Sequence, residues 1–101
     1  MPFVNNFFSL SQRHEVIGDV RGVGLALGVE FSKNRETREP YHAFCQEFLR
    51  RFRDNGVISG SDGEYQNCVK MRPPLIVQRH HIDFALTAFD KTLREMKNAK
   101  F

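Results

Sequence analysis

The stretch GDVRGVGLALGVEF, Gly18 to Phe31, sets four glycines beside an Asp–Arg pair and ends in an alternating pattern. A glycine-rich phosphate loop is followed by a helix, whose N-terminus presents free N–H groups to the anion. Here the residues after the glycines instead have the two-residue period of a strand, with apolar side chains at Leu25, Leu27, Val29 and Phe31. The stretch therefore predicts a strand and not a dinucleotide site. Its glycines indicate a bulge or the close approach of another backbone.

The composition is that of one small globular unit. The chain has 101 residues, of which 41% are hydrophobic and ten are Phe, enough for one core and too few for two domains. The net charge of +3 is spread along the chain apart from RRFR at Arg50 to Arg53, so no polyanionic partner is required. No apolar run reaches the length of a membrane span and the start lacks a signal-peptide pattern, so we expect a soluble intracellular protein.

Apolar spacing predicts the helices. The most secure one begins near Pro40 and carries Tyr41, Phe44, Cys45, Phe48, Leu49 and Phe52 at intervals of three and four, before Asn55-Gly56 ends it as a left-handed C-cap. A second amphipathic helix runs from Ile82 to Met96. The start, Phe3 to His14, has helical spacing but many poor helix formers, so its structure is left open.

Short apolar runs between turn signals predict the strands. They are a brief strand at 16–17 that ends at the turn residues Gly18 and Asp19, a longer one at 23–32, a short one at 57–58, and another at 68–71 that Pro73-Pro74 stops. Residues 33–40 are expected to be a surface connection and 59–67 a polar turn. The order predicts an α+β fold, a small mixed or antiparallel sheet of three to four strands covered on one face by two helices.

Metal binding, catalysis and nucleic-acid binding find little support. His42, Cys45, Cys68 and the pair His80-His81 could in principle hold zinc, but only one short pair exists, and both cysteines sit in apolar patterns typical of reduced core residues. No nucleophile signature is present, so a self-contained enzyme is not expected and no catalytic residue is assigned. Acidic residues interleave with the basic ones, which disfavours nucleic acid as a partner.

The stretch NCVKMRPPL places two positive charges close together. Lys70 and Arg72 alternate onto one side of the predicted strand, and Cys68 is expected on the same side. Two cations that project together repel each other unless an anion or water lies near. Two interpretations stay open: an edge strand whose polar face meets water, and an anion-binding lip for a carboxylate or phosphate.

At this point a family resemblance can be stated. The chain contains, in order, RHEVIGDVRGVGLALGVEFSKNRETREP, a helix, NGVIS, NCVKMRPPLIV and a final amphipathic helix. This order of segments resembles the C-terminal small domain of class III aminotransferases. These pyridoxal-phosphate enzymes include the 4-aminobutyrate, ornithine and alanine–glyoxylate types. The resemblance covers about Ser11 to Met96, so residues 11–101 are expected to form the small domain and residues 1–10 to lie outside it.

The resemblance implies a division of labour with a large domain that these residues do not include. In the family, the large domain holds the lysine, aspartate and phosphate loop that bind pyridoxal 5'-phosphate, so none of the five lysines here is expected to bind the cofactor. The chain alone is expected to be inactive. The small domain would supply a wall of the substrate cleft and part of the packing of a homodimer in the cytoplasm, with the mitochondrion as the alternative for the parent enzyme. Asp19 and Arg21 would be structural charge partners.

The resemblance also assigns candidate substrate-binding residues, Lys70 and Arg72. The Lys70 position is usually an arginine in the amino-acid-specific members, and a lysine offers a point charge in place of a planar fork. KMRPPL is similar to the subgroup that acts on amino-alcohol phosphates, including phospho-lyases. The alternative hypothesis is a stand-alone interaction module of the same fold that binds an acidic partner or an organic phosphate through the same two residues.

Overall fold

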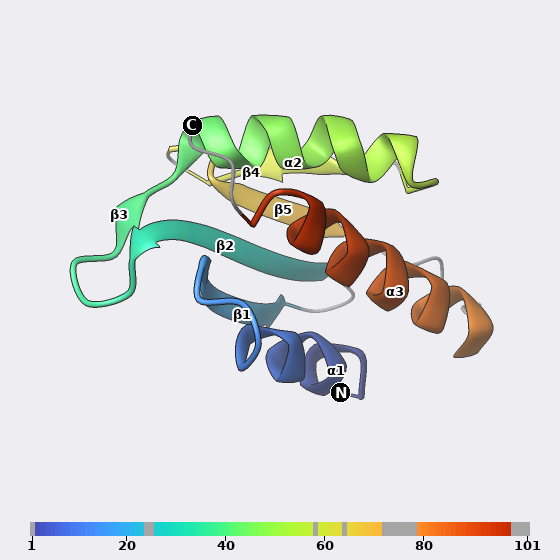
Figure 1. Ribbon diagram of the computed structural model, residues 1–101. Helices are drawn as coiled ribbons and strands as arrows, with labels where there is room; N and C mark the ends of the chain where they lie inside the picture. The colour runs from blue at the N-terminus through green and yellow to red at the C-terminus, as the bar shows by residue number, and fades with distance from the viewer. Residues whose placement is uncertain (1, 24–25, 58, 64, 72–78, 98–101) are drawn as a thin grey trace.

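The computed structural model describes residues 2–23, 26–57, 59–63, 65–71 and 79–97. Figure 1 shows a small sheet with helices packed against it. In chain order the elements are α1 (Pro2–Ser11), β1 (Ile17–Val23), β2 (Ala26–Asn34), β3 (Glu39–Pro40), α2 (His42–Asp54), β4 (Gly60–Asp62), β5 (Cys68–Met71) and α3 (Arg79–Glu95).

The strands form one antiparallel sheet. Its order is β1-β2-β5-β4, and the two-residue β3 pairs with the end of β2. The predicted α+β fold with a small antiparallel sheet is confirmed. Within the described residues the sheet has five strands where three to four were expected, and α1 adds a third helix to the two that were predicted.

All three helices contribute to one core on a single face of the sheet. Phe89 of α3 lies at its centre, with its ring centroid 5.2 Å from Phe7 of α1, 4.6 Å from Phe48 and 5.3 Å from Phe52 of α2, and 6.2 Å from Phe31 of β2. In Figure 1 α3 lies between α1 and α2, and it contacts both. The rings of Phe7 and Phe52 meet Phe89 edge to face, whereas those of Phe48 and Phe31 are tilted against it. Aromatic pairs at these separations add to the energy of burial.

Helix α2 has the predicted apolar stripe. Phe44, Cys45, Phe48 and Phe52 are buried, while Arg50 and Arg53 of the RRFR segment are exposed. The helix starts at His42, two residues later than predicted, because Pro40 pairs with Ser32 in β3.

The C-terminal end of α2 is the expected left-handed cap. Gly56 has a φ of +101°, its N–H donates to the Arg53 carbonyl at 3.0 Å, and the Val57 N–H donates to the Phe52 carbonyl at 3.1 Å. This pair of bonds is the Schellman motif, which satisfies the last carbonyls of a helix.

Two strand predictions need correction. Gly18 and Asp19 do not end a strand, because β1 continues through them with a bulge between Ile17 and Asp19. The predicted polar turn at 59–67 contains β4, which pairs with β5, and Val57 belongs to no strand. Ile58, the other half of the strand predicted at 57–58, lies outside the described residues.

Polar contacts fix the end of α1 against the rest of the fold. His14 Nε2 lies 2.7 Å from the Asp90 carboxylate of α3, and Arg13 and Arg94 also pair with that carboxylate. Burial raises the pKa of Asp90, but the hydrogen bond with His14 and the two arginine charges outweigh it and leave the pKa lowered. Arg35 follows β2 and donates hydrogen bonds to three backbone carbonyls. These belong to Ser11, the last residue of α1, and to His14 and Glu15, which follow the helix.

Candidate functional site: the charged face of the sheet

The strand register places polar residues together on the face opposite the core. Leu27 pairs with Met71 and Val29 with Val69, and these four side chains are buried under the helices. The intervening residues point the other way because side chains alternate along a strand. The charged sheet face therefore consists of Asp19 and Arg21 from β1, Glu30 from β2, and Cys68 and Lys70 from β5.

Arg21 is the centre of the charge pattern on this face. Its guanidinium lies 3.4 Å from Asp19 and 3.5 Å from Glu30, and Nη2 lies 3.7 Å from the Cys68 Sγ. Arg21 and Asp19 thus form the charge pair that was expected. The Glu30 side chain is only 17% exposed, so its ion pair with Arg21 is screened less by water than a pair at the rim.

Lys70 lies on this face as the alternation predicted, on the same side as Cys68. It is half-buried and stands opposite Gly28 of β2 and Gly60 of β4. A Cβ built on Gly60 would meet nothing within 4 Å, and one on Gly28 would meet only the Arg21 carbonyl at 4.0 Å. Backbone without side chains on both flanks lets a ligand or another chain approach the lysine closely.

Arg72 lies outside the described residues, so its pairing with Lys70 stays a prediction. Glu30 was not predicted as a member of this face. Its signal was present in the alternation of Leu27, Val29 and Phe31, which leaves Glu30 on the opposite side. The pairing of β2 with β5 sets Glu30 beside Cys68, and the structure then shows that the Glu30 carboxylate contacts the Arg21 guanidinium.

Cys45 and Cys68 are both buried and form no disulfide in the structure. Burial, with a smaller contribution from Cys68, raises the pKa of Cys45 to about 12. His42 points elsewhere, with Nδ1 3.2 Å from the Tyr65 carbonyl. Within the described ranges no group of three His, Cys, Asp or Glu side chains could hold a metal ion, and the side chains of His80 and His81 lie outside them. Those ranges also contain no helix long and apolar enough to cross a membrane.

Comparison with known proteins places this sheet and its helices in a family. The family model described as "Aminotransferase class-III" matches residues 2–93, from α1 into α3. This chain belongs to the class-III aminotransferase family.

Relatives of this class-III chain include one animal protein and one plant protein. It is 38% identical over 88 residues to ethanolamine-phosphate phospho-lyase homolog 1 of Caenorhabditis elegans, covering 86% of this chain and 19% of that protein. It is 36% identical over 87 residues to alanine–glyoxylate aminotransferase 2 homolog 2, mitochondrial, of Arabidopsis thaliana, covering 86% of this chain and 18% of that protein.

Two solved structures have the same fold. A phospholyase from Arthrobacter in complex with phosphoethanolamine superposes with a TM-score of 0.83 at 30% identity, covering 91% of this chain and 22% of that one. A transaminase with L-alanine gives the same TM-score at 26% identity, covering 94% of this chain and 22% of that one. The chain spans about a fifth of the length of these relatives.

The described residues of this class-III chain do not fit the family cofactor on their own. Pyridoxal phosphate needs a lysine amine for its imine, a carboxylate for its ring nitrogen and donors for its phosphate, shielded together from water. Lys33, Lys91 and Lys97 are exposed and Lys70 is half-buried, so none of the described lysines is enclosed in this way.

Proposed function

We propose that residues 11–101 act as the small domain of a pyridoxal-phosphate-dependent class-III enzyme and form one wall of its substrate cleft. The observation that carries this proposal is the asymmetry of the sheet. Helices cover one face, whereas the other presents Arg21, Glu30 and Lys70 beside open glycine backbone. A face of this kind suits contact with a charged substrate and with a second domain.

Lys70 is proposed as the anion-binding residue of this wall, with Arg72 as its neighbour. The ammonium group of Lys70, at a half-buried strand position, would bind phosphate as a point charge. The Arg21–Glu30 ion pair lies on the same face of the sheet and contributes to the electrostatic potential there. Two relatives favour an amino-alcohol phosphate as substrate: the C. elegans protein is named for ethanolamine phosphate, and the Arthrobacter phospholyase was solved with phosphoethanolamine. The proposed reaction is therefore phospho-lyase chemistry, with transamination as the other activity found among the relatives.

A large domain outside these residues is proposed to hold the cofactor, which supplies an electron sink for carbanion chemistry when bound. This chain then contributes binding and orientation and is inactive alone. Titration with pyridoxal phosphate tests that part of the proposal. An imine absorbance at one equivalent that disappears on replacement of a single lysine would show that this chain holds the cofactor by itself.

Packing against other polypeptide is part of the same proposal. Phe8, Tyr65 and Phe84 are each more than half exposed, which is costly for large aromatic side chains unless a partner covers them. We propose that the large domain and a second copy of the enzyme cover such surface in a homodimer. The compartment proposed is the cytoplasm, with the mitochondrion as the alternative because the Arabidopsis relative is named mitochondrial.

A chimera tests the proposed function directly. This chain would replace the matching segment of the Arthrobacter phospholyase, and kcat/KM for phosphoethanolamine would be measured. Loss of a charged hydrogen bond to phosphate costs about 1.5–3 kcal/mol, so Lys70→Ala should lower kcat/KM by roughly 10- to 150-fold. Lys91→Ala, at an exposed position of α3, is the matched control and should leave it unchanged.

Two outcomes would count against the proposal. If the chimera binds its cofactor and its Lys70→Ala variant has the same kcat/KM, Lys70 does not bind the substrate. A chain that stays a monomer by size exclusion and does not assemble with a large domain would favour the stand-alone module that binds an acidic partner or an organic phosphate.

A further inference from the structure

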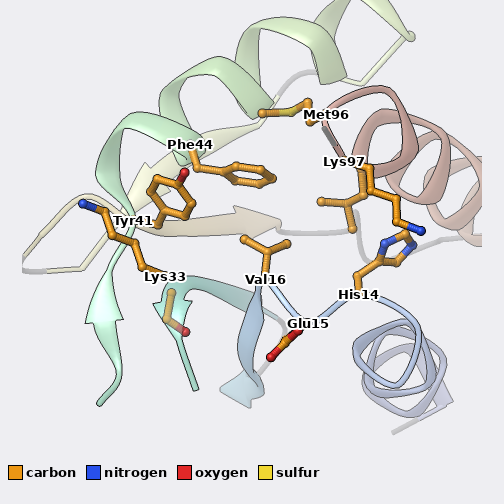
Figure 2. Close-up of a pocket in the computed structure, with 10 residues that line it drawn as sticks. His14, Glu15, Val16, Lys33, Tyr41, Phe44, Met96 and Lys97 are labelled. Carbon is orange, nitrogen blue, oxygen red and sulfur yellow. The ribbon is translucent and has the colours of Figure 1, made fainter. Parts of the chain in front are cut away.

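A pocket of about 400 Å³ opens on the helix-covered side of the sheet, whereas Lys70 lies on the other face. Four parts of the chain meet there: the segment before β1, the end of β2, the start of α2 and the end of α3. Figure 2 shows their side chains arranged around a common space. The volume lies in the range of sites for small organic molecules.

The inner wall of the pocket is apolar and firmly held. Phe44, Leu93 and Met96 line it and are themselves buried members of the core. Tyr41 and Val16 continue the wall toward the surface, and the Tyr41 and Phe44 ring centroids are 5.2 Å apart. A wall anchored in the core keeps its shape without a ligand, so little ordering cost opposes binding of an apolar group.

The mouth of the pocket carries more positive than negative charge. In Figure 2 Lys33 lies on the Tyr41 side and Lys97 on the His14 side. Lys33 pairs with Glu39 at 3.7 Å, but both side chains are about half exposed, and such a pair is weak. Lys97 has no ion pair within the part of the chain that the structure describes.

Among the described lining residues, Glu15 is the one that carries a negative charge, and it is exposed. The His14 ring is held by Asp90, with Nε2 2.7 Å from that carboxylate. Two ammonium groups therefore face one carboxylate around an apolar cavity. This combination disfavours a cationic ligand and gives a neutral one no ion-pair partner at the mouth.

We propose that this pocket binds a small carboxylate with an aromatic or branched apolar body. The body packs against Phe44, Leu93 and Met96, and the carboxylate lies at the mouth within reach of the Lys97 ammonium. The proposal rests on the pocket alone and does not depend on the function proposed above. For a ligand of about eleven non-hydrogen atoms, the dissociation constant should be on the order of 1 mM.

Ligand-observed NMR with the 101-residue chain tests the proposal, with 3-phenylpropionate as the probe. We expect saturable binding of 3-phenylpropionate. The two comparison probes, 3-phenylpropanol and 3-phenylpropylamine, have the same apolar body without the negative charge. The carboxylate should bind at least about threefold more tightly than the alcohol, and also more tightly than the amine. Lys97→Gln should weaken binding of the carboxylate by about two- to fivefold and leave the alcohol unchanged, as expected for an exposed charge pair.

Two variants control this experiment. Lys91→Gln makes the same charge change six positions earlier, in α3, at a position that does not line the pocket, and it should bind like the unmodified chain. Val16→Phe should fill the cavity and abolish binding of both probes, while circular dichroism verifies that the fold is kept. The proposal is overturned if no saturable binding occurs up to several millimolar, if Lys91→Gln weakens binding as much as Lys97→Gln, or if folded Val16→Phe still binds.

Discussion

Gly18→Ala is expected to destabilise the fold because the bulge in β1 presses this residue against β2. An alanine Cβ at position 18 would lie 2.0 Å from the Ser32 Oγ and 3.2 Å from the Ser32 Cβ, and Ser32 is only 2% exposed. Rotation of the serine moves its Oγ but not its Cβ, so overpacking remains and costs about 1–3 kcal/mol. Gly18 does not have a positive φ, so alanine also restricts the unfolded chain and returns about 0.4–1 kcal/mol.

The net expectation is a loss of about 1–2 kcal/mol in the free energy of unfolding. For a domain of this size that corresponds to a fall in Tm of roughly 5–15 °C, measured by thermal circular dichroism at fixed protein concentration. In the Ser32→Gly background the same Gly18→Ala change should cost nothing, which gives a coupling energy of about 1 kcal/mol or more in a double-mutant cycle.

Gly28→Ala is the matched control for the steric argument. It makes the same change on the neighbouring strand, where the new Cβ meets only the Arg21 carbonyl at 4.0 Å, so stability should stay level or rise slightly. The reasoning would be refuted if Gly18→Ala were no less stable than Gly28→Ala, or if Ser32→Gly left the cost of Gly18→Ala unchanged.

Three further predictions concern the helices. Gly56→Ala should cost about 1–2 kcal/mol by thermal unfolding, because φ is +101° and the new Cβ would lie 3.0 Å from the Phe84 ring; an unchanged Tm would contradict this. Asp90→Asn should cost about 1–2 kcal/mol in urea at pH 7. Because the folded pKa of Asp90 lies below the ordinary 3.8, its stabilising contribution is complete above that pH and is lost as pH falls through the folded value. The stability difference between the two proteins should therefore shrink below pH 3.8, and a difference that grew there would contradict this. Cys45, whose pKa burial raises to about 12, should resist alkylation at pH 8 until the chain unfolds, as judged by mass spectrometry of its peptide.

Much of the helical structure could be predicted because its signals are local. The stripe from Phe44 to Phe52 and the Asn55-Gly56 end identify α2 from the sequence, and the structure confirms both. Strand β5 also matches its predicted bounds, 68–71, because prolines follow an alternating run. Each of these elements is fixed by residues within a few positions of one another.

The elements that were mispredicted depend on distant partners. Gly18 has turn chemistry, yet β1 continues through it because the glycine leaves room for Ser32 on the paired strand. Pro40 fits a helix start, but it sits in β3 opposite Ser32. Strand β4 lies in a polar stretch without a strand pattern and is extended through its pairing with β5. In each case, tertiary pairing overrides the local preference.

The charged sheet face extends this argument to the candidate site. Alternation along a single strand predicted that Lys70 and Cys68 share one side, but the sequence could not say what faces them. The register supplies Arg21 from 47 positions earlier in the chain, and Glu30 then holds its guanidinium next to Cys68. Local sequence therefore sets which face a charge lies on, and strand order sets which charges meet. The anion-binding role proposed for Lys70 depends on the second of these, since strand order sets Lys70 between Gly28 and Gly60, whose lack of side chains leaves room for a ligand.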